Sequence, residues 1–291
     1  MVDISLPEVP LQRSATARPL QTLAICSGKG GVGKTNVSVN LAVAMAGLGR
    51  RVMLLDADLA LANVDVLLGL RAHGHLGHVL DGELCLEDII RTGPEGVALV
   101  PAASGLSRLA RLDSAEYAGL IHAFSTLDRP LDVFIVDVAA GIGESVTIFT
   151  QAVQEVIVVV CDEPASLADA YALIKVLSTE QRLRRFQVLA NMVVNGSQGQ
   201  SIFTKLSSVC QRYLDVSLNY MGAVPRDDFL RKAVLKQQAV TSAYPGSPSG
   251  RAFKELAQRA DNPLRAMESS GGVEFFIERM VSEQRCEPCP L

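Results

Sequence analysis

Short apolar runs rich in β-branched residues recur along the chain and alternate with longer stretches of helical pattern. The runs lie at 21–26, 51–55, 97–100, 132–137, 155–161, 186–190 and 217–223, and the helical stretches include 34–48, 144–153, 165–179 and 198–212. A run such as Val-Ile-Val-Val-Val lacks the polar alternation of a half-exposed strand, which is typical of strands covered on both faces. The alternation therefore predicts an α/β fold, with a mainly parallel, doubly wound sheet flanked by helices.

The pattern divides the chain into three parts. Residues 1–20 contain three prolines without sustained periodicity and are interpreted as a flexible arm. Residues 21–262 are predicted to form one domain, in which a last helix over 250–260 follows a break rich in proline and glycine. Residues 263–291 are interpreted as a linker, a helix over 273–284 and a tail. The apolar positions of this helix share one face: Val273, Phe276, Ile277, Met280 and Val281.

Composition narrows the classes of protein. The formal net charge is −4, so no general basic footprint indicates nucleic acid, and sequence-specific DNA binding is not expected. The six cysteines are scattered, unlike a secreted disulfide framework, which favours a reducing cytosol. The sequence has neither a signal-peptide pattern at its start nor an apolar run long enough for a bilayer span. We therefore expect a cytoplasmic protein.

Residues 28–35 match the phosphate-loop pattern G-x-x-x-x-G-K-[ST] between a predicted strand and a predicted helix. Backbone N–H groups of such a loop point at phosphates, which predicts a nucleotide phosphate site. Lys34 is predicted to bridge the β- and γ-phosphates, and the Thr35 hydroxyl to bind Mg²⁺. The full predicted contact set is Gly28, Lys29, Gly30, Gly31, Val32, Gly33, Lys34, Thr35 and Asn36. Lys29 adds a cation that the pattern does not require.

Carboxylates follow two other predicted strands, at the rim where parallel strands place ligands. Asp137 ends an apolar run and suits a magnesium role through a water molecule. Asp56 and Asp58 lie just past the run at 51–55, where an acid can reach the site and position an attacking water, although aspartate at strand ends is also common in turns.

Three ordered motifs, KGGVGKT, LLDADLALANVD and IVDVAAGIG, resemble those of the deviant-Walker ATPases of the MinD/ParA group over residues 21–240. Within that group, KTNVSVNLA, VPAASG and CDEPAS are similar to the flagellar-number regulators of the FleN/FlhG type. The resemblance implies that Lys29 reaches the partner's phosphates in an ATP-bound dimer, as an arginine finger does elsewhere.

The resemblance also implies roles for residues beyond the loop. Asp58 would activate the water and Asp56 would support the metal, while Asn63, Glu163 and Asp169 would lie at the dimer interface, with Glu163 also near the nucleotide. The implied adenine region contains Asn191, Pro225 and Asp227. Family members often have a hydroxyl residue after the Walker B aspartate, and Val138 stands there instead, which would alter the hydrolysis rate.

The resemblance implies a slow, regulatory ATPase that is a homodimer with ATP and a monomer with ADP. Its implied partner is an AAA+ transcriptional activator of flagellar genes, and a polar flagellar GTPase is a second implied partner. The helix over 273–284 would lie on the inner face of the cytoplasmic membrane or dock into a groove of the protein itself. Its acidic polar face predicts weak attraction to anionic lipid.

Three alternatives stay open at this stage. A division-site ATPase of the MinD type would share every catalytic motif. An iron–sulfur carrier ATPase would use Cys286 and Cys289 as a cluster-binding pair. A ParA-like DNA-partitioning protein would need a basic surface, which the acidic composition disfavours.

Overall fold

The computed structural model describes residues 19–59, 62–70, 73–102, 112–261 and 274–276. Within these ranges the strands form one eight-stranded sheet in the order β3-β4-β2-β5-β1-β6-β7-β8, parallel except for the β3–β4 pair. The strands are β1 Gln21–Ser27, β2 Val52–Ala57, β3 Arg91–Thr92, β4 Ala98–Val100, β5 Val133–Ala140, β6 Glu155–Val160, β7 Arg185–Val193 and β8 Ser217–Pro225. The predicted α/β fold with a mainly parallel sheet is confirmed.

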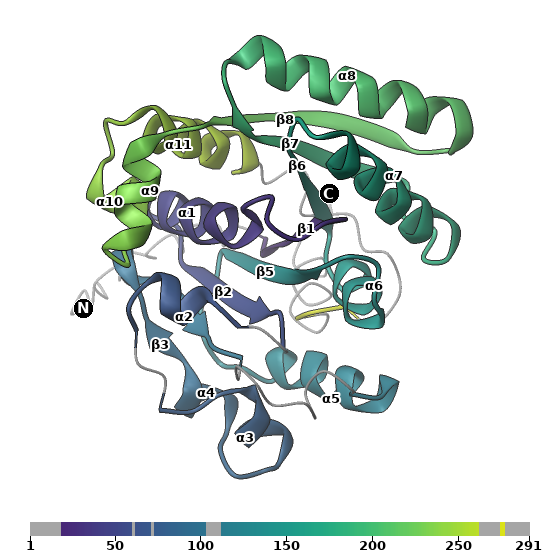
Figure 1. The fold of residues 1–291 in the computed structure, drawn as a ribbon. Helices are drawn as coiled ribbons and strands as arrows, with labels where there is room; N and C mark the ends of the chain where they lie inside the picture. The colour runs from purple at the N-terminus through teal and green to yellow at the C-terminus, as the bar shows by residue number, and fades with distance from the viewer. Residues whose placement is uncertain (1–18, 60–61, 71–72, 103–111, 262–273, 277–291) are drawn as a thin grey trace, which may run out of the picture.

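Helices cover both faces of the sheet (Figure 1). One face carries α1 Lys34–Gly47, α2 Val64–Leu67, α9 Asp228–Leu235, α10 Val240–Ala243 and α11 Pro248–Ala260. The other face carries α5 Ser114–Ser125, α6 Glu144–Gln151, α7 Pro164–Thr179 and α8 Gly196–Tyr213. Three short elements lie near the β3 edge, namely α3 Leu76–Leu80, α4 Leu86–Ile89 and the 3₁₀ helix η1 Pro94–Gly96.

Two hydrophobic cores, one on each face, hold these layers together. Successive strand residues point to opposite faces, so in β1 the side chains of Leu23 and Ile25 pack under α1, while Ala24 and Cys26 pack towards α6 and α7. All four side chains are at most 1% exposed. Full burial of one such leucine or isoleucine is worth about 1.5–3 kcal/mol, which explains why these strands have no polar face.

Helix α5 was not among the predicted helical stretches. Its start is set by a reciprocal cap, because the Asp113 carboxylate accepts the backbone N–H groups of Ala115 and Glu116 at 2.9 and 2.8 Å. Glu116 in turn accepts the backbone N–H of Asp113 at 2.9 Å. Two signals for this helix were available, namely the D-x-x-E motif of the capping box and the helical spacing of Tyr117, Leu120, Ile121 and Phe124.

Part of the predicted C-terminal helix is described, and it differs from the prediction. Glu274–Phe276 form a turn rather than the start of a helix, since the backbone φ of Phe276 is 58°, in the left-handed region. Phe275 and Phe276 are fully buried against Phe124 and Phe134, and the Phe275 N–H donates to the carbonyl of Ala152 at 3.0 Å. Val273, Ile277, Met280 and Val281 lie outside the described residues. No helix in the described part of the chain is long and apolar enough to span a membrane.

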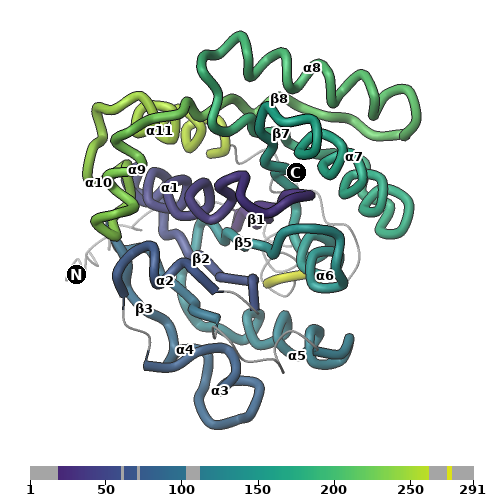
Figure 2. Tube along the Cα trace, viewed as in Figure 1, coloured from purple at the N-terminus to yellow at the C-terminus, as the bar shows by residue number. Residues whose placement is uncertain are grey.

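The strand order gathers distant segments at one rim. β1 lies between β5 and β6, and β5 lies between β1 and β2. Figure 2 shows β1, β5 and β2 side by side. In register, Asp137 of β5 is level with Ile25 of β1 and with Asp56 of β2. The loops after β1, β2 and β5 therefore leave the sheet side by side, at its carboxyl edge, where ligands of open parallel sheets bind.

Candidate nucleotide-binding site

The loop between β1 and α1 needs glycine at two positions for steric reasons. A Cβ on Gly28 would lie 2.1 Å from the carbonyl oxygen of Asp169 in α7, so only glycine allows this close approach. Gly33 has a φ of 84°, and a Cβ there would lie 2.5 Å from Nδ2 of Asn191. Around Gly30 and Gly31 a Cβ would meet nothing within 4 Å. The loop is thus pressed against α7 and β7 at its ends and open at its tip.

Lys34 begins α1 and is buried beside the predicted magnesium carboxylate. Its Nζ lies 2.9 Å from Oδ1 of Asp137, and the two side chains are 8% and 1% exposed. Ser38, one helical turn further along α1, places its hydroxyl oxygen 2.7 Å from the same carboxylate oxygen. Within the described residues, Oδ2 of Asp137 is buried and has no hydrogen-bond partner. The two residues that the motifs predict as phosphate and metal contacts are therefore neighbours.

Lys29, the second lysine of the loop, points to the opposite side and is far more exposed. Its Nζ lies 2.7 Å from Oε2 of Glu163, with the side chains 39% and 58% exposed. The hydrogen bond that the Lys29 ammonium donates to Glu163, and the negative charge of Glu163, raise the pKa of Lys29, so the ammonium stays charged. Glu163 directly precedes α7. The negative charge of Asp169, within α7, also raises the pKa of Lys29. Three of the four predicted dimer-interface residues, Lys29, Glu163 and Asp169, thus interact within one chain.

Asp56 organises the loop after β2. Its carboxylate accepts backbone N–H groups from Asp58 at 3.2 Å, Asn63 at 2.9 Å and Val64 at 3.0 Å. Burial, and then the nearby charge of Asp137, raise the pKa of Asp56 to about 7. Because both of its oxygens already accept backbone donors, the described geometry makes Asp56 an anchor that positions Asp58 and Asn63. Its metal role stays a prediction.

The predicted adenine region comes from β7 and β8. Asn191 donates through Nδ2 to the carbonyl of Val32 at 2.7 Å, and its Oδ1 is buried with no partner in the described chain. Pro225, the last residue of β8, pairs with Val193. Asp227 is occupied otherwise, since it caps α9 through the Phe229 N–H at 2.9 Å and accepts the N–H and hydroxyl of Ser249 at 2.9 and 2.6 Å. The described contacts give Asp227 a role in holding α9 to α11, and its predicted adenine contact stays a prediction.

Two residues of the Walker B region face different ways. Asp137 points towards α1, whereas Val138 is fully buried in the core under α5–α8. Consecutive strand side chains alternate between faces, so Val138 fills a core position rather than facing the loop. The site residue that sequence reasoning missed is Ser38. Its signal was the spacing of four from Lys34, which places both on one face of a helix.

The fit of ATP and Mg²⁺ to this site can be tested on two buried acceptor atoms. Buried oxygens in folded proteins almost always have donors, so Oδ2 of Asp137 and Oδ1 of Asn191 can accept hydrogen bonds from water or from a ligand. A metal-bound water suits the carboxylate, and an amino group suits the amide oxygen. Across the described ranges, no group of three His, Cys, Asp or Glu side chains forms a metal cage. Magnesium in nucleotide sites uses one or two protein ligands and phosphate oxygens, so the residues present fit both groups.

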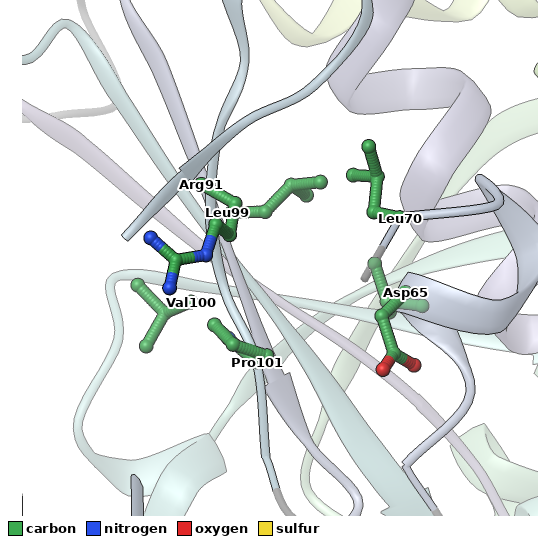
Figure 3. Close-up of a pocket in the computed structure, with 7 residues that line it drawn as sticks. Asp65, Leu70, Arg91, Leu99, Val100 and Pro101 are labelled. Atoms are coloured by element: carbon green, nitrogen blue, oxygen red, sulfur yellow. The ribbon is translucent and has the colours of Figure 1, made fainter. Parts of the chain in front are cut away.

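Two hollows elsewhere in the molecule contain none of the predicted site residues. One, of about 10 Å³, lies between α2 and β4 (Figure 3) and is lined by Val64, Asp65, Leu70, Arg91, Leu99, Val100 and Pro101. Its volume is about that of one water probe, so it holds no nucleotide. The other, of about 530 Å³, is an open depression lined by residues of α2, η1 and α10 and their flanks, including Lys236 and Gln237. Neither hollow is lined by residues of the phosphate loop.

The parallel sheet, the glycine loop leading into α1 and the Lys34–Asp137 pair define a P-loop nucleotide-binding protein. Residues 23–240 match the family model of the CobQ/CobB/MinD/ParA nucleotide binding domain, so the chain belongs to that family.

Individual relatives agree with this assignment. The chain is 53% identical over 272 residues to the Antiactivator FleN of Pseudomonas aeruginosa, covering 93% of this chain and 97% of that protein. It is 33% identical to the flagellum site-determining protein YlxH of Helicobacter pylori, covering 89% of each. Among solved structures, the septum site-determining protein MinD of Pyrococcus horikoshii, complexed with Mg-ADP, has a TM-score of 0.68 at 28% identity. That match covers 84% of this chain and 96% of the MinD chain. The predicted membership of the MinD/ParA group, with similarity to a FleN-type regulator, is confirmed.

Proposed function

We propose that the protein is an ATP-dependent dimerising switch that regulates flagellar number by binding and restraining a transcriptional activator. The observation that carries this proposal is the division of one loop between two lysines. Lys34 is buried beside Asp137, whereas Lys29 is 39% exposed and lies on the outer side of the loop. A single subunit needs only the first for its own nucleotide, so the second suits a nucleotide held by another subunit.

The bound species is ATP with Mg²⁺. The backbone N–H groups from Gly30 to Thr35 and the Lys34 ammonium would hold the phosphates, and Asn191 would receive the adenine amino group. The Thr35 hydroxyl and, through water, Asp137 would hold the metal, which supplies neutralisation of the charge that develops on the phosphates. Lys34 would exchange the carboxylate of Asp137 for the phosphates. Mg-ADP bound to the MinD structure supports this choice.

The position of Lys29 supports the proposed ATP-driven dimerisation. Its ammonium pairs with Glu163 in the same chain at 2.7 Å, so this ion pair would open before Lys29 could contact a second subunit's phosphates. An exposed ion pair contributes little net free energy. Lys29 can therefore exchange Glu163 for the phosphates of a nucleotide at little cost in stability. Asp169 and Asn63 would join the contact surface around it. Hydrolysis would be slow, with Asp58 orienting the water.

The flagellar role rests on similarity to the Pseudomonas Antiactivator FleN and to the Helicobacter flagellum site-determining protein. By this similarity, the dimer would bind an ATP-dependent AAA+ activator of flagellar genes, and a polar flagellar GTPase would be a second partner. Division-site placement is less favoured, because the Bacillus subtilis septum site-determining protein MinD is only 27% identical. Burial of Phe275 and Phe276 supports docking of the C-terminal segment on its own subunit. In the proposed switch, the released segment would contact the inner face of the cytoplasmic membrane.

Size-exclusion chromatography with light scattering tests the switch directly. Wild-type protein should be a dimer with Mg-ATP and a monomer with Mg-ADP, Lys29→Ala a monomer in both, and Asp58→Ala a persistent dimer with ATP. Equal dimerisation in both nucleotides would remove the switch. Counting flagella in a deletion strain tests the biological role separately, and a normal number would remove that role while leaving the ATPase intact.

A further inference from the structure

The buried Asp137 carboxylate has two donors, and they come from one helix. Lys34 and Ser38 are a turn apart on α1, and both contact Oδ1 of Asp137, at 2.9 and 2.7 Å. Ser38 and Asp137 are 0% and 1% exposed, so water does not compete for this hydrogen bond. A buried carboxylate without donors is costly, which makes each of these two contacts important for the orientation of the side chain.

The Ser38 hydroxyl carries one hydrogen but has two acceptors in reach. The other acceptor is the Lys34 carbonyl at 3.1 Å, the usual partner of a serine inside a helix. The carboxylate oxygen is nearer and negatively charged, and such charge-assisted bonds are shorter and stronger than neutral ones. The hydrogen is therefore assigned to Asp137, with the helix carbonyl as a weaker second neighbour.

We propose that Ser38 is a positioning residue for the magnesium site, resting on the proposed binding of Mg-ATP. When Lys34 turns to the phosphates, Oδ1 of Asp137 keeps Ser38 as its donor within the described residues. The hydroxyl holds the carboxylate plane so that Oδ2, which has no protein partner among them, stays directed into the site. Without the hydroxyl, the carboxylate would rotate or follow Lys34, and the metal would lose its outer ligand.

A test compares Ser38→Ala with wild type for binding of a fluorescent ATP analogue, in EDTA and in excess Mg²⁺. Loss of a hydrogen bond to a charged group predicts that the affinity gained from Mg²⁺ shrinks about tenfold, with affinity in EDTA changed by less than about twofold. Ser38→Cys keeps the volume with a weaker donor and should fall between the two. The matched control is Ser178→Ala, a buried helical serine in α7 that bonds Lys175 instead.

The outcomes distinguish a positioning role of Ser38 from a general loss of binding and from failure of the proposed function. Equal loss of affinity with and without Mg²⁺, or an unchanged Mg²⁺ gain in folded Ser38→Ala and Ser38→Cys, would overturn the positioning role. If Ser38→Ala does not fold, the cysteine variant alone decides the question by the same ratio. Wild-type protein that gains no affinity from Mg²⁺ would instead overturn the proposed function itself.

Discussion

The phosphate loop holds two lysines in different environments, an inner one, Lys34, and an outer one, Lys29. Lys34 is 8% exposed and paired with an almost fully buried aspartate, whereas Lys29 and its partner Glu163 are each more than a third exposed. Removing one partner of a buried ion pair is strongly destabilising, while a solvated pair contributes little. Lys34 therefore has a structural role beside its proposed contact with the phosphates. Lys29 is available for exchange with an external anion at little cost to the fold.

The largest expected effect concerns turnover in Lys29→Ala. A cation supplied in trans to a phosphoryl transfer is worth about 10³-fold or more, so ATP hydrolysis should fall on the order of 10³-fold. Binding of ATP to the monomer and the melting temperature should stay close to wild type. Phosphate release, nucleotide titration and thermal unfolding measure the three quantities. Unchanged turnover would show that the outer lysine acts only within its own subunit.

Much of this contrast was predictable, because runs of apolar residues and three motifs located both lysines, Asp56, Asp58 and Asp137 at one rim. The side-chain contacts of these residues were not predictable from the sequence. The Lys29–Glu163 and Ser38–Asp137 contacts join residues 134 and 99 positions apart, and their geometry depends on strand register and helix packing. Helix α5 combines a capping box with buried residues at helical spacing, and the Phe275–Phe276 turn packs against Phe124, Phe134 and Phe149.

The next effect concerns stability in Lys34→Ala. Loss of the ammonium leaves Asp137 as a buried charge with a single donor, so the free energy of unfolding of the nucleotide-free protein should fall by about 3–5 kcal/mol. Urea denaturation measures this difference. Lys34→Ala combined with Asp137→Asn should recover part of it, because the uncompensated charge is gone. A loss below about 1 kcal/mol in the single variant would mean that the inner lysine is no more structural than the outer one.

A smaller effect is expected from pH, through Asp56. Burial raises its pKa to about 7 in the folded protein, so between about pH 4 and 7 the folded state keeps a proton that the unfolded state releases. This contribution to the stability of the nucleotide-free protein is therefore full below about pH 4 and is lost as the pH rises to about 7.

Thermal unfolding across this range, for wild type and Asp56→Asn, isolates the contribution of Asp56. The variant should show a flatter profile because its amide does not titrate. Parallel profiles for the two proteins would assign the pH dependence to other groups.

The smallest effect is expected from Glu163→Gln, which removes the charge that holds Lys29 in its own chain. The melting temperature should change little, because the pair is exposed, and the ATP concentration at half-maximal dimerisation should fall about two- to threefold. Asp162→Asn is a matched control, since Asp162 contacts Gln198 and lies near Lys205 rather than Lys29. Weaker dimerisation in Glu163→Gln alone would show that Glu163 supports the dimer more than it competes for Lys29.

The central position of β1 sets the order in which this site can come into being during protein synthesis. Lys34 and Asp137 are 103 residues apart, and β1 has no neighbour along its length until β5 or β6 has been made. At about 5–20 residues per second, the ribosome finishes the loop roughly 5–20 s before it delivers the carboxylate that completes the site. A nascent chain therefore carries the glycine loop before Asp137 has been made, and the proposed ATP site can be complete only after β5 has been synthesised.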